Sequence, residues 1–390
     1  MQRSSSKVLV TGLGAVSSLG VGVTAMWEGL LAGRCGIGPL ARLDPAAHRI
    51  GHAGEVRGLS VDSSAGSEDL AFQYALSACR EALGDIPEDR RGGIAIVLGS
   101  NFGAMGQTER LLDGEVDARS PSLIGDVTDK VAQALRIGGV RSTLSLSCAS
   151  GNAAIGYAAD LIRAGYADAA LACGFDAISE TVWAGLCSLR AMTQDVLRPF
   201  DRRRDGTIFA EGAGAVLLDN ERHSSESGTR PLAQLLGYAT TSNAFHMTHP
   251  DADGAGLAHA MRDALRDAGL GPEAIDHINA HATGTGPNDK LETAAIKSVF
   301  GERARSIPIN GLKSMLGHAM GAASALEAIA CVLSIRDGII PPTIHLEEPD
   351  PECDLDYVPN TARKMKVRYA MNNSAGFGGC NAATIFGAVE

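Results

Sequence analysis

Cys148 has the setting in this sequence that most favours chemistry. It ends an extended run, Ser142-Thr-Leu-Ser-Leu-Ser, and a run of small residues from Ala153 to Ile162 with helical apolar spacing follows closely. A cysteine on such a strand-to-helix turn lies at a helix N-terminus, where free N–H groups and the helix dipole favour the thiolate. The same N–H groups can stabilise an oxyanion on a bound thioester. The alternative is a buried cysteine that only fills space between helix and sheet.

Three polar clusters end predicted strands in the second half of the chain. The run His281-Ala-Thr-Gly-Thr places a histidine before hydroxyls on a glycine-rich turn. The run Lys313-Ser-Met-Leu-Gly-His directly precedes a helix that contains Glu327. The run Asn373-Ser-Ala-Gly-Phe-Gly-Gly has glycines, which let backbone N–H groups approach a ligand closely. Together with Cys148, these clusters supply a cysteine, two histidines and a lysine.

Each cluster also has a purely structural interpretation. A strand-end histidine is more often a satisfied core residue than a catalyst, and Thr-Gly-Thr is ordinary turn chemistry. In the same interpretation Lys313 is a surface charge and the glycines form a hairpin. No pair of histidines or carboxylates shows metal-ligand spacing, so we expect no metal site. The combination of the four reactive groups at strand ends is what favours catalysis.

Composition narrows the classes of function. The chain has 390 residues, too many for one small domain, and its net charge of −11 argues against nucleic-acid binding. Its eight cysteines show neither a CxxC pair nor zinc spacing, which is typical of free thiols in a reducing compartment. The first residues pass straight into a strand at Val8, and no apolar run reaches transmembrane length. We therefore expect a cytoplasmic protein without a signal peptide or membrane contact.

The elements that must position these residues repeat along the chain. The first half is predicted to contain a helix at 68–83, a strand at 94–98, a strand before Cys148, a helix after it, and strands at 169–174 and 213–218. The second half repeats this order with a helix at 257–270, strands at 277–281 and 307–310, a helix at 322–336, and strands at 367–372 and 381–388. The pattern predicts a duplicated, mostly parallel α/β fold in which the strand ends of both halves converge.

Residues 221–231 are the most linker-like stretch, so we expect two halves, 1–230 with Cys148 and 231–390 with the His/His/Lys set. Gly12-Leu-Gly14 suggests a dinucleotide fingerprint, but the full spacing and the acidic residue that should follow are missing. Nucleotide binding is therefore not expected there.

With these residues in view, the sequence resembles the β-ketoacyl-acyl carrier protein synthases, condensing enzymes of the thiolase superfamily. The resemblance runs nearly end to end and is carried by Cys148-x-Ser-Gly, Arg198-Pro-Phe-Asp, Glu211-Gly-Ala-Gly, His281-x-Thr-Gly-Thr, Lys313-Ser-Met-x-Gly-His and Gly376-Phe-Gly-Gly. It implies a duplicated thiolase-like fold, layered αβαβα, with two mixed, mostly parallel sheets. It also implies no bound cofactor, because the substrates arrive on the phosphopantetheine of an acyl carrier protein.

The resemblance implies a role for each site residue. Cys148 would accept the acyl chain as a thioester, while His281 and His318 would assist decarboxylation of a malonyl unit and stabilise the enolate. Lys313 and Glu327 would hold the histidines in place. Phe377 would gate the site and complete an oxyanion hole with the Cys148 N–H. The implied substrate-binding residues are Thr283, Thr285, Phe377, Gly376 and Gly378.

The segments 242–248, 288–293 and 350–356 look more like ketosynthase subunits of type II polyketide systems than like fatty-acid elongating enzymes, which remain the alternative. Such subunits pair with a chain-length factor that lacks the active cysteine, so the expected partner is that homologue or a second copy. His318 favours elongation, because synthases that start chains carry Asn there. Cys380 follows the C-terminal glycines, unlike the second cysteine of degradative thiolases, and is expected in the core.

Two questions remain open from the sequence. The segment 62–68 lacks the basic residues that many relatives use to dock the acidic carrier, so docking is expected at Arg202–Arg204 or on a partner, unless these arginines form internal salt bridges. Ala375 replaces a bulkier residue and is expected to widen the acyl pocket. A non-catalytic dimer partner and an acyltransferase without decarboxylation are the other functional hypotheses.

Overall fold

Two sets of five strands, one from each part of the chain, share one strand order. The computed structural model describes residues 7–65, 68–115, 123–247, 251 and 253–389. The first set runs β6 (Arg141–Leu144), β5 (Ala95–Gly99), β7 (Ala169–Asp176), β8 (Gly212–Asn220) and β1 (Val8–Ser17). The second set runs β11 (Ile309–Asn310), β10 (His277–Asn279), β14 (Tyr369–Gly376), β15 (Cys380–Gly387) and β9 (Ala233–Ser242). This correspondence confirms the predicted duplication.

The strand directions also repeat. In the first set β5 is parallel to β6 and β7, and in the second β10 is parallel to β11 and β14, while the remaining pairs in each set are antiparallel. The sets meet where Val8–Val10 of β1 pair antiparallel with Ala233–Leu235 of β9. The two expected mixed sheets are therefore joined, through three residue pairs, into one sheet of eleven strands that includes β2 (Gly20–Val21).

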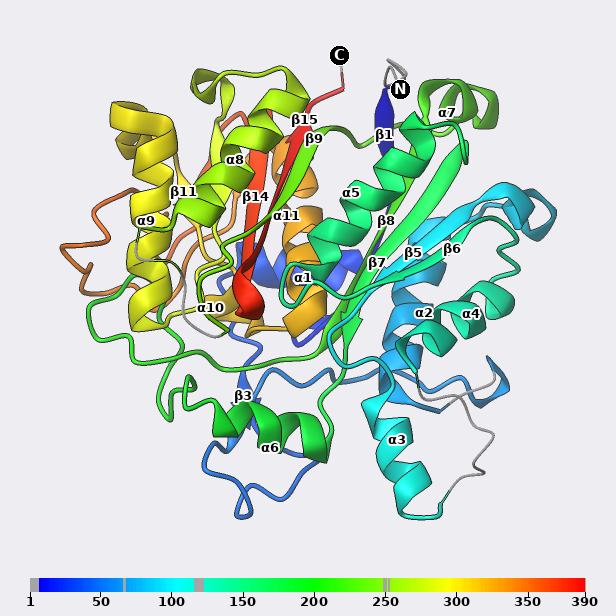
Figure 1. Cartoon of the computed structure of the whole chain (residues 1–390), viewed down its shortest axis with the longest axis horizontal. Coiled ribbons are helices and arrows are strands. Elements are labelled where there is room, and N and C mark those ends of the chain that lie inside the picture. The colour runs from blue at the N-terminus through cyan, green and yellow to red at the C-terminus, as the bar shows by residue number, and fades with distance from the viewer. Residues whose placement is uncertain (1–6, 66–67, 116–122, 248–250, 252, 390) are drawn as a thin grey trace.

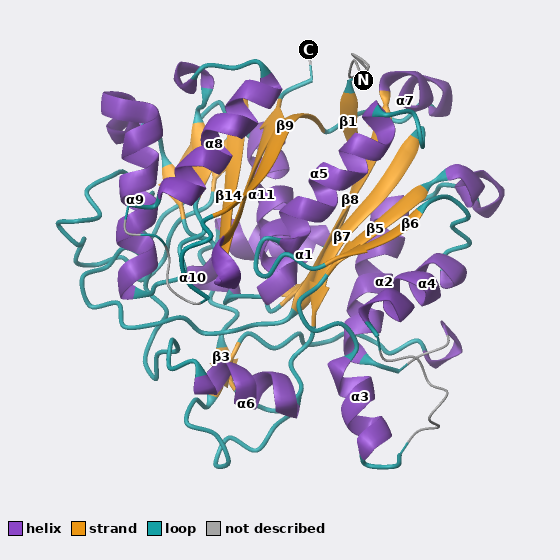
Figure 2. Cartoon of the chain, viewed as in Figure 1, coloured by secondary structure: helices purple, strands orange, loops and turns teal. Residues whose placement is uncertain are grey.

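Helices on both faces complete five layers (Figures 1 and 2). Helices α2 (Leu70–Leu83) and α4 (Ile124–Ala134) pack on the outer face of the first set, and α8 (Ala255–Ala268) and α9 (Gly286–Phe300) on that of the second. Helices α5 (Ser150–Arg163) and α11 (Ala323–Asp337) lie between the sets in a third apolar cluster. This is the αβαβα layering implied by the resemblance.

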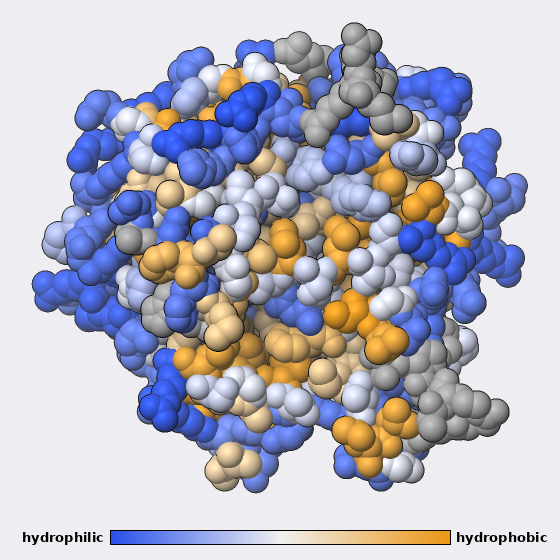
Figure 3. Space-filling view, in the orientation of Figure 1, coloured by the Kyte–Doolittle hydropathy of each residue, from blue (hydrophilic) through white to orange (hydrophobic). Residues whose placement is uncertain are grey.

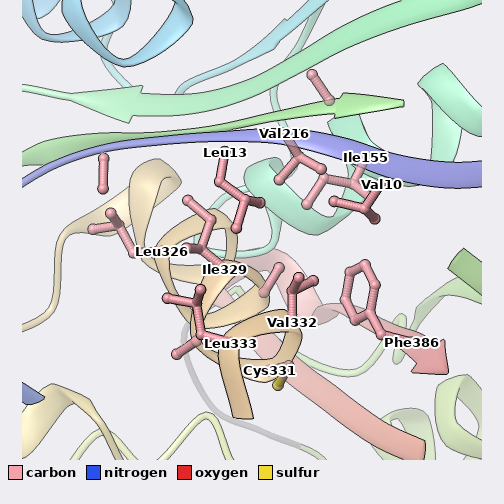
Figure 4. Packing of buried hydrophobic residues seen from close by; sticks show 14 of the residues in the cluster. Val10, Leu13, Ile155, Val216, Leu326, Ile329, Cys331, Val332, Leu333 and Phe386 are labelled. Atoms are coloured by element: carbon pink, nitrogen blue, oxygen red, sulfur yellow. The ribbon is translucent and has the colours of Figure 1, made fainter. Parts of the chain in front are cut away.

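Helix α11 is buried on all sides, as a helix in the middle layer must be. Figure 4 shows Leu326 and Ile329 of α11 below Leu13 of β1. The small residues in this layer allow close approach, since a Cβ on Gly151 of α5 would lie 2.6 Å from the Ala325 nitrogen. The helix that follows the candidate nucleophile is thus packed directly on α11.

The glycines of the first strand serve packing. Gly12 and Gly14 lie inside β1, where α2 comes so close that an added Cβ would lie 2.0 Å from the Ala82 oxygen and 1.9 Å from the Ala78 oxygen. A side chain at either position would push α2 off the sheet. This explains a glycine pair that does not belong to a nucleotide-binding loop.

The linker-like segment contains a short helix, α7 (Glu221–Ser227). The Asn220 side chain accepts a hydrogen bond from the His223 N–H at 2.7 Å, and Gly228 ends the helix in the left-handed region with φ 69°. Its polar composition is therefore that of an exposed capped helix, and the division into 1–230 and 231–390 stays a prediction.

The other elements are α1 (Val23–Leu31), α3 (Met105–Leu112), α6 (Glu180–Ser188), α10 (Lys313–Leu316), β3 (Gly38–Pro39), β4 (His52–Ala53), β12 (Ile339–Ile340) and β13 (Arg363–Lys364).

The topology brings the predicted site residues to one edge. The parallel strands β5, β6 and β7, and likewise β10, β11 and β14, end on the same side of their set. Cys148 follows β6, His281 follows β10, Lys313 follows β11, and Gly376 ends β14. None of the helices described is long and apolar enough to cross a membrane.

Candidate active site

Cys148 lies on a tight turn between β6 and α5. Ser147, just before it, has φ 53°, a left-handed conformation that is uncommon for a residue with a side chain. The turn is held by the Ser150 hydroxyl, which donates to the Ser147 carbonyl at 2.6 Å and accepts from the Leu146 N–H at 2.9 Å. Cys148 is 5% exposed, so the turn presents its thiol to an almost closed space. The predicted strand-to-helix cysteine is confirmed.

The expected thiolate is not supported. Burial raises the pKa of Cys148 to about 12, and the nearby Lys313 ammonium opposes this only in part. The helix N-terminus contributes less than its position suggested, because the N–H groups of Ala149 and Ser150 already donate to the carbonyls of Leu146 and Ser147. The resting group is therefore the neutral thiol.

The glycine-rich loop after β14 lies against the cysteine turn. An added Cβ on Gly376 would be 2.7 Å from the Ser147 Cβ and 3.0 Å from the Cys148 nitrogen. Only glycine permits this contact. Among the described backbone hydrogen bonds outside helices and strands, none uses the N–H of Cys148 or of Phe377 as donor. The Cys148 N–H faces its own sulfur, and Phe377 lies with Cys148 in the wall of one cavity.

The two histidines converge on the cysteine. Their ring centroids are 5.4 Å apart at an interplanar angle of 87°, and Cys148 Sγ and a ring nitrogen of each lie within 4.8 Å of one another. The Met320 N–H donates to Nδ1 of His318 at 3.1 Å, and Lys313 Nζ lies 3.3 Å from Nδ1 of His281. A neutral imidazole that accepts at Nδ1 carries its proton on Nε2. Both rings therefore present an Nε2–H donor at the thiol.

The histidines are neutral at pH 7. Burial lowers the pKa of His281 and of His318 well below the ordinary value, and the Lys313 charge lowers both further. Lys313 itself is 1% exposed and forms an ion pair with the equally buried Glu327, with Nζ and Oε1 2.5 Å apart. The sequence placed these residues correctly near the histidines, but Lys313 is a core residue, not the surface charge of the alternative interpretation.

Two buried carboxylates hold this arrangement and were not identified from the sequence. Glu292 of α9 accepts hydrogen bonds from the N–H groups of His281 and Ala282 at 2.7 and 2.8 Å. Asp176, at the end of β7, accepts from the Gly321 N–H at 2.7 Å, three residues after His318. Burial raises the pKa of Glu292 to about 7 and that of Asp176 to about 6. Their sequence signal was weak, since a carboxylate inside a helix or at a strand end reads as a surface residue.

These groups share a cavity of about 390 Å³. Its walls include eight of the predicted residues: Cys148, His281, His318, Thr283, Thr285, Ala375, Gly376 and Phe377. Lys313 and Glu327 lie behind the histidines, and Gly378 is outside the wall. Gly379 of the glycine cluster also lines the cavity, and the walls not anticipated are Leu189, Arg190, Ala191, Asp205, Thr207, Phe209, Asn243, Gly286, Pro287, Asn288 and Asn381. Most of these are in loops distant in sequence, where a single sequence gives no signal.

The mouth of the cavity is partly apolar. Phe377 is 36% exposed, and the nearby Gly378 N–H donates to the Met247 carbonyl at 2.7 Å. Figure 3 shows apolar side chains around a hollow in the lower half of the molecule, above helix α6. Inside the mouth, the hydroxyls of Thr283 and Thr285 are 2.9 Å apart. The cavity therefore offers an apolar entrance, a hydroxyl pair and a reactive end.

Cysteine and histidine side chains are also metal ligands, and the fold brings three of them together from distant segments. The ammonium of Lys313 lies 3.3 Å from His281 Nδ1, and such a charge repels a second cation. The set therefore fits proton transfer and anion stabilisation better than metal binding.

Two expectations need correction or refinement. Cys380 is half-buried at the start of β15, because it follows the open glycine loop, and is not in the core. Arg204 is buried and forms an internal salt bridge with Asp350 at 2.7 Å. Arg202 and Arg203 form exposed pairs with Glu348 and Glu347, each at 2.6 Å, so carrier docking at these two residues stays a prediction.

Comparison with known proteins agrees with this geometry. The chain matches the family models for the N-terminal domain of β-ketoacyl synthase over residues 5–224 and for the C-terminal domain over residues 232–347. The 3-oxoacyl-[acyl-carrier-protein] synthase 2 of Coxiella burnetii is 37% identical over 98% of this chain and 99% of that protein. The enzyme of the same name from Synechocystis is 38% identical over 97% of each.

Solved structures give the same result. A chain of the ishigamide ketosynthase/chain length factor has a TM-score of 0.93 and 39% identity, covering 99% of this chain and 100% of that one. A chain of AntDE:AntF, a type II polyketide acyl carrier protein bound to its ketosynthase, has a TM-score of 0.89 and 33% identity, with the same coverage. Fold and relatives define a thiolase-fold acyltransferase. The chain belongs to the β-ketoacyl synthase family.

Proposed function

We propose that this chain is an elongating ketosynthase of a type II polyketide pathway, which condenses malonyl-carrier with an acyl chain held on Cys148. The observation that carries this proposal is the convergence of the Cys148 thiol and two neutral histidines, each with an Nε2–H donor, within 4.8 Å. A nucleophile that holds one substrate and two donors that stabilise an enolate on the other are what a decarboxylative condensation requires.

In the first half-reaction Cys148 takes the acyl group. Its sulfur attacks the thioester carbonyl of the acyl-carrier, and the oxyanion accepts hydrogen bonds from the N–H groups of Cys148 and Phe377. Collapse breaks the carbonyl–sulfur bond of the carrier, whose thiolate takes up the proton that the cysteine lost. The products are acyl-Cys148 and the free carrier thiol.

In the second half-reaction malonyl-carrier occupies the same cavity. Its carboxylate leaves as CO₂, and the electron pair of the broken carbon–carbon bond forms an enolate whose oxygen accepts from Nε2–H of His281 and His318. The enolate carbon attacks the acyl-Cys148 carbonyl, the carbonyl–sulfur bond breaks, and the cysteine leaves as a thiolate that takes a proton from water. A β-ketoacyl-carrier is released.

The remaining predicted residues fit supporting roles. Lys313 donates to Nδ1 of His281 and fixes its tautomer, while Glu327 balances the buried charge. Thr283 and Thr285 offer paired hydroxyls for the amides of a pantetheine arm, and Phe377 covers the mouth. The cavity needs no resident cofactor, since the phosphopantetheine arrives on the carrier. We place the protein in the cytoplasm, where such carriers act.

The pathway assignment rests on relatives. Of the two similar solved complexes, one is a ketosynthase/chain length factor and the other is a type II polyketide ketosynthase with its acyl carrier protein. The curated relatives carry the name 3-oxoacyl-[acyl-carrier-protein] synthase 2, so a fatty-acid elongating enzyme is the second candidate. We propose a carrier protein as partner and a heterodimer with a cysteine-less homologue. A homodimer that elongates acyl-carriers alone would instead favour the fatty-acid enzyme.

Mass spectrometry tests the nucleophile. The protein is incubated with acyl-carrier, and the mass of one acyl group is expected on wild type and on Cys35→Ala, whose cysteine is exposed and far in sequence from the site. Cys148→Ala should take up no acyl group. An acylated Cys148→Ala protein would overturn the assignment, and full pathway activity of that variant would support a non-catalytic partner instead.

The histidines separate condensation from simple acyl transfer. His281→Ala should acylate Cys148 but release no CO₂ from malonyl-carrier. Unchanged turnover of that variant would point to an acyltransferase that makes esters or amides without decarboxylation.

A further inference from the structure

A hydrogen-bonded amide pair lies beneath the catalytic cavity, outside its walls. The Asn372 Nδ2 donates to the Asn152 Oδ1 at 2.9 Å and to the Ser324 carbonyl at 2.8 Å. Its Oδ1 accepts from the Asn279 Nδ2 at 2.8 Å. All four residues are fully buried. Asn372 therefore bonds three elements that come from different parts of the chain.

Asn152 uses every hydrogen-bonding position of its side chain. Its Nδ2 donates to the Asn372 carbonyl at 3.2 Å and to the Ser374 hydroxyl at 3.1 Å. Its Oδ1 accepts from Asn372 and from the Thr384 hydroxyl at 3.2 Å. In addition its backbone N–H donates to the Ser324 hydroxyl at 3.0 Å. A saturated buried amide is rigid, because any shift leaves a polar atom unpaired.

The elements joined by this pair carry both halves of the reaction. Asn152 lies one helical turn after Cys148 on α5, and Asn372 lies on β14, which ends in the loop of the oxyanion donor Phe377. Asn279 is two residues before His281 on β10, and Ser324 is in the first turn of α11, just after the His318 loop. The pair thus connects the nucleophile of one half to the histidines of the other.

We propose that Asn152 and Asn372 are positioning residues that hold acyl-Cys148 and the decarboxylating histidines in register, so that the enolate is captured by the acyl group. This inference rests on the proposed ketosynthase function. Acylation needs only the cysteine turn, and decarboxylation needs only the histidines. Condensation alone needs both at a fixed separation, since a misplacement of about 1 Å can cost on the order of 100-fold in rate.

The proposal predicts a specific failure when the pair is broken. The enolate would form with release of CO₂ and then take up a proton instead of attacking the thioester, so that malonyl-carrier becomes acetyl-carrier. Asn152→Leu keeps the size of the side chain and removes its four hydrogen bonds. We expect condensation to fall on the order of 100-fold, with CO₂ release much less affected. Wild type should release one CO₂ for each β-ketoacyl product.

The experiment measures three quantities on the full-length protein with its partner: acylation of Cys148, CO₂ released from malonyl-carrier, and β-ketoacyl product. Leu265→Ala in the outer helix α8 is the control, because it opens a core cavity away from the site. Thr384→Val is the milder variant, since it removes one hydrogen bond to Asn152 and keeps the shape. It should raise the ratio of CO₂ to product in the same direction, by less.

The outcomes are distinct. The positioning role is overturned if the ratio of CO₂ to β-ketoacyl product is the same in Asn152→Leu and Thr384→Val as in Leu265→Ala. That result would leave the ketosynthase function intact. If Asn152→Leu does not fold, Thr384→Val decides alone. A wild-type protein that acylates Cys148 but forms no β-ketoacyl product would instead overturn the proposed function.

Discussion

The ion pair of Lys313 and Glu327 allows stability and catalysis to be separated by mutation. Both side chains are 1% exposed, and Glu327 Oε2 has no hydrogen-bond partner among the described residues. Removing one member of a buried pair costs about 3–5 kcal/mol, because the other charge is left in an apolar core. We therefore expect Lys313→Met to lose about that much free energy of unfolding at pH 8.

The loss should depend on pH with a defined sign. Burial raises the pKa of Glu327 to about 7, and Lys313 already limits that rise. A carboxyl with a raised folded-state pKa destabilises the fold as pH rises, since the unfolded chain releases the proton near pH 4.3 and the folded chain retains it. In wild type this cost stops growing above about pH 7, where Glu327 ionises in the folded chain, whereas in Lys313→Met it keeps growing at about 1.4 kcal/mol per pH unit. Between pH 7 and pH 8.5 the stability deficit of the variant relative to wild type therefore increases by about 2 kcal/mol.

Urea unfolding followed by fluorescence of the buried Trp27 and Trp183 measures the effect. The double variant Lys313→Met/Glu327→Leu should recover most of the lost stability and its pH dependence, because both charges are gone. It should remain inactive, since Nδ1 of His281 has lost its donor. The matched control is Lys290→Met, whose pair with Glu352 is exposed and therefore contributes little to stability. Equal stability of Lys313→Met at pH 6.5 and 8.5, or an active double variant, would refute the reasoning.

Two further predictions concern the reactive end of the cavity. Burial lowers the pKa of His281 and of His318, so the rate of CO₂ release should not fall as the pH is lowered from 8 to 6. A fall in that rate with a midpoint near pH 6.5 in wild type, absent from His318→Gln, would contradict the neutral tautomers. Gly376→Ala should slow acylation of Cys148 on the order of 100-fold, because its Cβ would lie 2.7 Å from that of Ser147. Gly286→Ala, which meets no atom within 4 Å, is the control, and equal acylation rates would show that the loop gives way.

Much of the site was readable from the sequence because its residues follow strand ends. Cys148, His281 and Lys313 come directly after runs with strong strand patterns, and the repeated element order predicted that those ends converge. The resemblance assigned Lys313 and Glu327 to holding the histidines, and in the structure these two residues form an ion pair at 2.5 Å. Local pattern was sufficient wherever a residue's role is fixed by its own strand.

The rest depended on contacts between distant segments. Glu292 supports His281 from a helix whose polar face gave no sign of burial, and Arg202–Arg204 could be assigned to salt bridges only once 347–350 lay beside them. The pKa of Cys148 was expected in the wrong direction, because a helix N-terminus is visible in sequence and the burial of the thiol is not. Burial and long-range pairing are properties of the assembled fold.

The electrostatics of the cavity explain why a neutral thiol does not prevent catalysis. At rest the reactive end of the cavity presents a thiol and two neutral imidazoles, and the Lys313 ammonium behind them is already paired with Glu327. In the proposed reaction, negative charge appears first on the acyl oxyanion and then on the enolate. Fixed N–H donors face each position, and they interact more strongly with a charge than with a neutral carbonyl in a site that excludes water. A resting thiolate would attract the same N–H donors before the reaction begins. The donors would then stabilise the transition state less relative to the resting enzyme.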